Sequence, residues 1–357
     1  MRPNLLYTAG YQPETVEKVE RLLELLTEFG GHPFLGPRAR LHGGTALNVF
    51  HLGMPRLSVD ADLTYVGQVS KEGLEEERPE MERALTELAA RLGYTVSTSG
   101  KAAHSGRTFK LRYGRGDQRD LIKVDLIYLN RAPLLDYEQA TCGMCSPETS
   151  VMTLALPELI AGKTKALFDR LAVRDLYDVH RIQEGGLPLS LAAGNDELYR
   201  LQRRVRIYYA SLSMPFPSPI DGHVVEKFAS RASEVEDELY PVLNVSDRPT
   251  LEAMMESAAR YIDEHVAPKE DEEQEYLRRM EESSEYVPRL LFDRWPAVLA
   301  RAEVSPAAEW KVMNLRKRPA SPTPTMPPDV LPATRMPPRR QRPPTPTTPQ
   351  ASAPPRS

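Results

Sequence analysis

The spacing of apolar residues changes partway along this 357-residue chain, and that change limits the possible folds more than any other feature. Over the first 130 residues, segments with helical spacing, such as 13–29, alternate with period-two segments, such as 57–66. From Pro157 onward nearly every segment has helical spacing. The pattern predicts an α+β (mixed α/β) bilobed protein, in which a mixed sheet with flanking helices precedes a helical lobe.

The boundaries of the expected elements follow from the same pattern and from the turn residues between segments. Helices are expected at 13–29, 45–52, 72–92, 157–170, 174–182, 196–211 and 251–265. Strands are expected at 34–42, 57–66, 94–99, 107–113 and 121–129. We therefore predict a sheet-containing lobe over 1–156, a helical lobe over 157–303, and a linker and tail over 304–357.

The last 39 residues, 319–357, contain 14 prolines, five arginines and one aspartate, so they cannot fold alone and are predicted to be disordered. The whole chain has a net charge of −4, and removing the tail's +4 leaves −8 on the folded part. Any contact with nucleic acid must therefore be local. No stretch reaches the roughly 20 apolar residues of a membrane span, and no apolar leader stands at the N-terminus, so we expect a cytoplasmic protein without membrane contact.

Two aspartates, Asp60 and Asp62, lie on the polar side of the expected strand 57–66. Residues i and i+2 of a strand project from the same face, which places the two carboxylates side by side. Paired carboxylates repel each other unless a cation lies between them, and Mg²⁺ prefers such ligands together with substrate phosphates. We predict a Mg²⁺ site, with two ions expected and Mn²⁺ as an alternative, and with Asp125 of strand 121–129 as a third ligand.

The stretch Gly43-Gly44-Thr45 precedes these aspartates and opens the expected helix 45–52. Glycines let a backbone approach a phosphate closely, and a helix start offers unpaired N–H groups. The three residues are therefore predicted to bind a nucleotide. Taken singly, a glycine pair is also an ordinary turn, and two alternating aspartates are also an ordinary solvated strand face.

In combination the motifs resemble a known family. GGTALNVFHLG, followed by Pro55-Arg56, Ser58 and DADL, is similar to the AbiEii and MenT group of nucleotidyltransferase toxins, within the superfamily of DNA polymerase beta. The segment PELIAGKTKALFDRLAVRDLYDVHRI, residues 157–182, resembles that group's second motif. The resemblance implies that Lys163 and Asp178 are essential.

Chemical roles can be assigned to these residues. Lys163 is a cation able to reach a triphosphate, and Asp178 either orients that lysine or takes a proton from the acceptor. Arg56 and Ser58 are predicted to bind the nucleotide, although Arg56 is equally suited to hold the turn by hydrogen bonding. The alternative for Lys163 is an ordinary exposed residue on an amphipathic helix.

The resemblance implies a Mg²⁺-dependent toxin that transfers nucleotides from an NTP to RNA, with the 3′ end of tRNA as the expected acceptor and a cognate antitoxin as partner. A second hypothesis keeps the fold but makes a protein hydroxyl the acceptor of a nucleotide or phosphoryl group. A third is a non-catalytic nucleotide-binding interaction protein.

Two further features leave alternatives open. Cys142 and Cys145 form a CxxC motif, which is too small for a zinc site by itself and indicates either a metal or redox role or two small loop residues. Arg200, Arg203 and Arg204 form a basic stripe, which either contacts RNA phosphates or belongs to a solvated helix with ion pairs.

Overall fold

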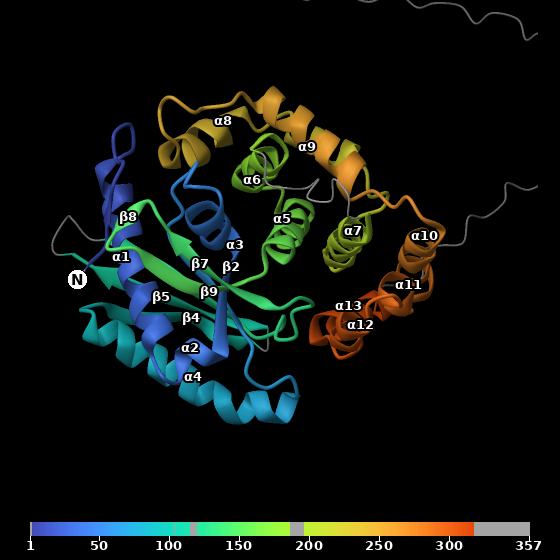
Figure 1. The fold of residues 1–357 in the computed structure, drawn as a ribbon, viewed down its shortest axis with the longest axis horizontal. Coiled ribbons are helices and arrows are strands. Elements are labelled where there is room, and N and C mark those ends of the chain that lie inside the picture. The colour runs from blue at the N-terminus through green and yellow to red at the C-terminus, as the bar shows by residue number, and fades with distance from the viewer. Residues whose placement is uncertain (1, 104, 115–119, 186–195, 318–357) are drawn as a thin grey trace, which may run out of the picture. The chain divides into compact units, whose positions relative to one another are not determined.

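The fold is described by a computed structural model, which covers residues 2–103, 105–114, 120–185 and 196–317. Residues Met1–Lys317 form one compact unit (Figure 1). The predicted disordered tail lies outside the described residues. The predicted division into lobes at residue 156 stays a prediction.

A seven-stranded mixed sheet with the order β4-β5-β6-β3-β2-β9-β7 forms the first half, and β1 and β8 make a separate two-stranded ladder. Strand β3 pairs in parallel with β6 and antiparallel with β2, which in turn pairs in parallel with β9. The strands are β1 Asn4–Leu5, β2 Ala39–His42, β3 Asp60–Tyr65, β4 Thr95–Ala103, β5 Gly106–Tyr113, β6 Asp120–Ile127, β7 Tyr137–Cys142, β8 Cys145–Ser146 and β9 Thr149–Leu154.

Thirteen helices are found in the part of the chain that the structure describes. They are α1 Pro13–Gly31, α2 Leu35–Arg38, α3 Gly43–Thr45, α4 Lys71–Arg91, α5 Leu156–Arg170, α6 Val173–Glu184, α7 Asp196–Ser211, α8 Ala232–Glu234, α9 Leu251–His265, α10 Asp271–Arg278, α11 Arg289–Phe292, α12 Pro296–Glu303 and α13 Pro306–Arg316. Short 3₁₀ or π-type turns lie at Ala46–His51, Gly222–Phe228, Val235–Leu239, Tyr240–Val242 and Arg279–Ser283.

The two faces of β3 have different chemistry, because side chains alternate along a strand. Ala61, Leu63 and Tyr65 are buried on one face, and the Tyr65 hydroxyl donates to Glu77 of α4 at 2.6 Å. Asp60 and Asp62 lie on the other face. Figure 1 shows α1, α2 and α4 on one side of the sheet and α3 and α5 on the other. The hydrophobic face is thus covered by the first group, which leaves the carboxylates facing the helices of the second half.

The fold class predicted from the sequence is confirmed, but some boundaries are corrected. Segment 34–42 is not one strand, because Leu35–Arg38 forms α2 before β2 begins. Strands β7 and β9 were not predicted. Helix α13 extends the folded part to Arg316, past the boundary at 303 that the sequence suggested. None of the described helices is both long enough and apolar enough to cross a bilayer.

Candidate functional site

The predicted metal-binding aspartates lie at neighbouring positions of the sheet. The register of β3 and β6 sets Asp62 opposite Asp125, and the register of β2 and β3 sets His42 opposite Asp62. Asp60 lies two residues before Asp62 on the same face of β3. The structure therefore brings the three predicted carboxylates to one place, next to the turn at Gly43.

Asp60 and Asp62 keep their carboxylates available. Among the described residues, no side chain donates a hydrogen bond to either carboxylate or forms an ion pair with it. Burial and the charge of Asp62 raise the pKa of Asp60 above its ordinary value, although Lys123 opposes this. A cation between the carboxylates would stabilise their charged forms, so this donor set fits a divalent metal ion.

Asp125 is in a different state from the other two. Its Oδ1 accepts a hydrogen bond from Thr108 at 2.5 Å, and its Oδ2 lies 2.5 Å from the ammonium of Lys123. Both oxygens are thus engaged, one by Thr108 of the neighbouring strand β5 and the other by Lys123 of β6, the strand of Asp125 itself. No group of three or more His, Cys, Asp or Glu residues with metal-binding geometry is found within the described ranges. The role of Asp125 as a third metal ligand stays a prediction.

The glycine pair lies so close to the site that a side chain at either position would displace a neighbouring side chain. Gly43 has a φ of +70°, and a Cβ there would lie 2.1 Å from Oδ2 of Asp62. A Cβ on Gly44 would lie 2.6 Å from the Arg56 guanidinium and 3.5 Å from the Lys163 ammonium. The backbone of the turn therefore approaches both a carboxylate and a cation, as the phosphate-binding prediction requires.

The hydroxyl of Thr45 ties the start of the helix to β3. It donates to the Asp60 carbonyl at 2.5 Å and lies 2.9 Å from the Ser58 hydroxyl. Both residues are buried, but only Ser58 lines a cavity, the one that also contains Asp60. Thr45 thus positions the turn, and Ser58 is the hydroxyl that faces the open space.

Asp178 of α6 lies at the centre of a buried network. Its side chain has no exposed area. Oδ1 accepts from Nε of Arg56 at 2.7 Å and from Asn48 at 2.9 Å, and Oδ2 accepts from Arg56 at 2.8 Å and lies 2.6 Å from Nζ of Lys163. Burial alone would raise the pKa of Asp178, but the charges of Arg56 and Lys163 outweigh it and hold the pKa well below its usual range.

Lys163 links this network to the carboxylates of the sheet. It is only 4% exposed, pairs with Asp178 and Asp175 of α6, and lines two cavities together with Asp62. The alternative of an ordinary exposed lysine is therefore wrong. The geometry favours Asp178 as the residue that orients Lys163, because Asp178 lines neither cavity.

Three adjoining cavities run past the carboxylates. The Arg174 cavity, of about 280 Å³, contains Gly44, Ser58, Asp60, Asp62, Lys163, Arg170 and Arg174 in its lining. The Gly162 cavity, of about 290 Å³, shares Asp62, Lys163 and Arg170 with it. The Trp310 cavity, of about 560 Å³, shares Asp125, Lys165 and Asp169 with the Gly162 cavity. The site is thus a cleft with the carboxylates at the junction of its first two parts.

Sequence reasoning missed Asn48, which is fully buried and also donates to the Gly44 carbonyl at 3.0 Å. Its signal was an asparagine within the short helix that follows the glycines.

The structure also bears on the two features for which the sequence left alternatives open, the CxxC motif and the arginine stripe. Cys142 and Cys145 are buried free thiols, and burial raises the pKa of Cys142 to about 12, which favours the structural alternative.

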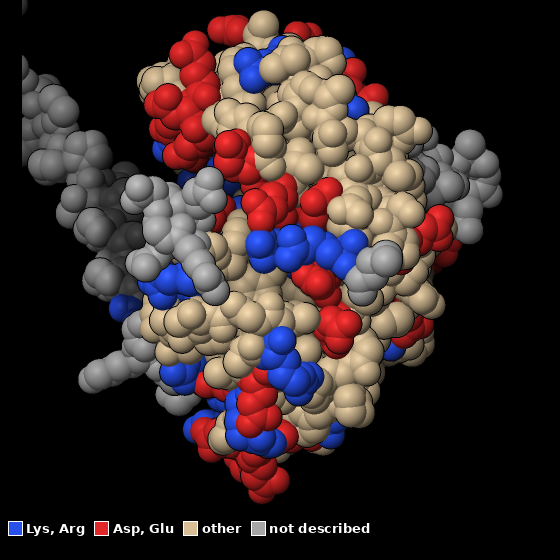
Figure 2. Space-filling view, turned by 90° about the vertical axis from the view of Figure 1, so that its left-hand side faces the viewer, with Lys and Arg blue, Asp and Glu red and all other residues tan. Residues whose placement is uncertain are grey.

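The arginine stripe on α7 is held by acids at the start of α10, including the residue Glu270 that caps it. Arg203 and Arg204 are buried and pair with Glu270 and Glu273. This favours the ion-pair alternative, although the helix face is buried and not solvated. On the face shown in Figure 2, basic side chains lie among acidic ones, without one broad basic surface in the part that the structure describes.

The chain is similar to known proteins in its sequence and in its fold. A family model described as "Nucleotidyl transferase AbiEii toxin, Type IV TA system" matches residues 24–298. MenT4, a nucleotidyltransferase toxin from Mycobacterium tuberculosis H37Rv, has a similar structure, with a TM-score of 0.54 and 16% identity, over 82% of this chain and 93% of that chain. JHP933 from Helicobacter pylori gives a TM-score of 0.41 and 13% identity, over 70% of this chain and 90% of that chain. No curated protein matches the chain.

Proposed function

The chain belongs to the AbiEii family of nucleotidyltransferase toxins, and from this premise we propose that it transfers nucleotides from an NTP to RNA in a reaction that needs Mg²⁺. The acceptor is the 3′ end of tRNA, whose modification stops translation. A cognate antitoxin is the protein partner, and the cytoplasm is the place of action.

One observation carries the proposal: Asp60 and Asp62, whose carboxylates have no hydrogen-bond or ion-pair partner among the described side chains, lie beside a glycine turn and a buried lysine. Divalent cations at this position, Mg²⁺ or in its place Mn²⁺, act as Lewis acids and lower the charge on the reacting phosphate. Asp60 and Asp62 hold them, and Asp125 is a candidate third ligand from the next strand.

The residues of the Arg174 cavity suit a triphosphate. Lys163 and Arg170, which both pair with Asp175, and Arg174 bring positive charge to it. Ser58 and the backbone at Gly44 supply donors. Among the described residues, the Arg174 side chain donates one hydrogen bond, to the backbone carbonyl of Glu238. Its charge is therefore not neutralised by an ion pair with another described residue, so it remains available to phosphate.

Lys163 stabilises the negative charge that develops on the transferred phosphate, because it lines the same cavity as Asp60 and Asp62. Asp178 is a positioning residue that fixes the direction of the Lys163 ammonium. Arg56 and Asn48 in turn fix Asp178, so Arg56 supports the site through the carboxylate even if it does not touch the nucleotide.

Expression of the protein in a bacterial host, followed by sequencing of RNA 3′ ends, tests the proposal. The wild type should arrest growth and add nucleotides to tRNA ends, and Asp60→Ala should do neither. Asp271→Ala is the matched control, because Asp271 is exposed at the start of α10 and lines none of the three cavities. Arrest with unaltered RNA ends would refute the RNA acceptor and favour a protein hydroxyl.

A further inference from the structure

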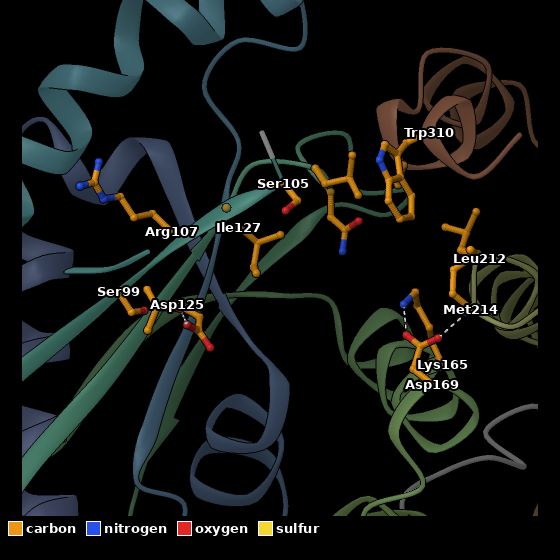
Figure 3. A pocket seen from close by; sticks show the side chains of 15 residues that line it. Ser99, Ser105, Arg107, Asp125, Ile127, Lys165, Asp169, Leu212, Met214 and Trp310 are labelled. Carbon is orange, nitrogen blue, oxygen red and sulfur yellow. Dashed lines mark hydrogen bonds and ion pairs between the residues drawn. The ribbon is translucent and has the colours of Figure 1, made fainter. Parts of the chain in front are cut away.

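The Trp310 cavity differs from the rest of the cleft in its chemistry (Figure 3). Ile127 and Leu129 form one wall from the sheet side, and Leu212, Met214 and Trp310 form the opposite wall from the helical side. Ser105 and Asn130 add polar groups between these walls. A space with apolar walls and a few hydrogen-bonding groups suits a flat heteroaromatic ring.

The charges of this cavity do not suit a phosphate. Arg107 donates to Glu82 at 2.5 Å, and Lys165 pairs with Asp169 within the same helix. Each cation at the cavity is therefore matched by a carboxylate. The Arg174 cavity, in contrast, contains the unneutralised Arg174, so phosphates and an aromatic base are expected at opposite ends of the cleft.

Trp310 is the residue best placed to bind such a base. It lies on α13, is 40% exposed, and makes no ring or cation contact with another described residue. In Figure 3 its indole projects from α13 toward the space opposite Ser105 and Ile127. The amide of Asn130 also has no hydrogen-bond partner among the residues that the structure describes. An exposed indole next to a free amide offers stacking and edge recognition together.

The geometry of in-line displacement indicates which of two bases, that of the acceptor RNA or that of the NTP, binds in the Trp310 cavity. The attacking oxygen approaches the phosphorus from the side opposite the leaving pyrophosphate. If the pyrophosphate leaves into the Arg174 cavity, the acceptor hydroxyl must come from the other side of Asp62. The Gly162 cavity and then the Trp310 cavity lie in that direction, since each shares lining residues with the one before.

We propose that the Trp310 cavity is the acceptor subsite, in which the terminal nucleobase of the RNA stacks on Trp310 and is contacted by Asn130. The inference rests on the proposed function and deepens it, because it assigns the acceptor and not the NTP to this cavity. The donor nucleoside then occupies the Gly162 cavity.

Fluorescence measures this stacking without turnover. The chain has two tryptophans, so Trp295→Phe leaves Trp310 as the only one. Intact tRNA should quench this fluorescence, tRNA lacking its 3′-terminal nucleotide should quench it less, and each of the four NTPs should leave it unchanged. Quenching by an NTP alone, or equal quenching by both tRNA forms, would overturn the assignment.

Kinetics give a second readout. Trp310→Ala should raise the KM for tRNA by roughly 5- to 150-fold, the range for loss of one stacked base, and leave the KM for NTP unchanged. Trp310→Phe should retain most of the affinity. Met313→Ala is the matched control, because Met313 is 52% exposed on the same helix and does not line the cavity.

The two proposals fail in distinguishable ways. A wild-type protein that labels no RNA refutes the proposed function. If the wild type labels RNA, the proposed function stands. The acceptor subsite alone is then refuted by a Trp310→Ala variant in which the KM for tRNA is unchanged or the KM for NTP rises.

Discussion

Replacing Asp178 with asparagine tests the network that positions Lys163. The carboxylate accepts hydrogen bonds from Asn48 and Arg56 and pairs with Lys163, all within 2.6–2.9 Å. An asparagine carries no charge and turns one acceptor into an NH₂ group that faces other donors. Arg56 then loses its carboxylate partner, and Lys163 loses the nearer of its two, keeping Asp175 at 3.2 Å.

The expected cost is large, because removing one partner of a buried ion pair costs about 3–5 kcal/mol. For the folded unit Met1–Lys317, whose unfolding entropy is about 2.1 cal/mol/K per residue, the melting temperature should fall by about 4–8 °C. The turnover number should fall as well, because the Lys163 ammonium loses its fixed direction. Thermal unfolding and steady-state kinetics of Asp178→Asn measure both effects.

Glu87→Gln serves as the control for this experiment. Glu87 pairs with Arg83 on α4, where both side chains are more than half exposed, so its melting temperature should change little. If Asp178→Asn has the melting temperature and the turnover number of the wild type, Asp178 does not position Lys163.

The same network predicts how stability depends on pH. Burial would raise the pKa of Asp178, but Arg56 and Lys163 hold it below its usual value in the folded state. The stabilisation is therefore complete above the unfolded pKa of about 3.9 and is lost progressively as the pH falls from there toward the lower pKa of the folded state. Urea unfolding at pH 7 and at pH 3 should show the wild type and Asp178→Asn converging at the lower pH. A constant difference between them would contradict the depressed pKa.

Three further outcomes are expected. Gly43→Ala should reduce turnover much more than Gly53→Ala, because both positions have positive φ but only at Gly43 does the Cβ meet Asp62. Steady-state kinetics measure turnover and unfolding curves measure stability, and equal turnover of the two variants would refute the close approach. Lys163→Met should lower kcat by about 10²–10³, and a rise in KM alone would contradict charge stabilisation. Asp60→Asn should weaken Mn²⁺ binding at least about tenfold in electron paramagnetic resonance titrations, and unchanged affinity would exclude Asp60 as a ligand.

Local sequence patterns were sufficient to predict which residues of the candidate site lie together on the sheet. The alternation around Asp60 and Asp62 fixes their common face, because the period of a strand is two residues. The glycines at 43 and 44 indicated a close backbone approach, and the structure has that approach at both positions. These features depend on residues that are near one another in the sequence.

Features that depend on distant partners were not predictable. Arg56 and Asp178 are 122 residues apart, and nothing in the local pattern of either one shows that they pair. Arg203 and Glu273 likewise lie in polar helical segments of the kind that usually face solvent, yet both are buried and pair with each other. Charge pairs of this kind are decided by how helices pack, which periodicity alone does not contain.

Incubation of the purified protein with NTPs labelled at the α-phosphate, Mg²⁺, and cellular RNA and protein tests the central claim most directly. The account predicts that label enters RNA with the wild type and that Asp62→Asn transfers none. Label found only in the protein fraction, or RNA labelling that persists in Asp62→Asn, would contradict it.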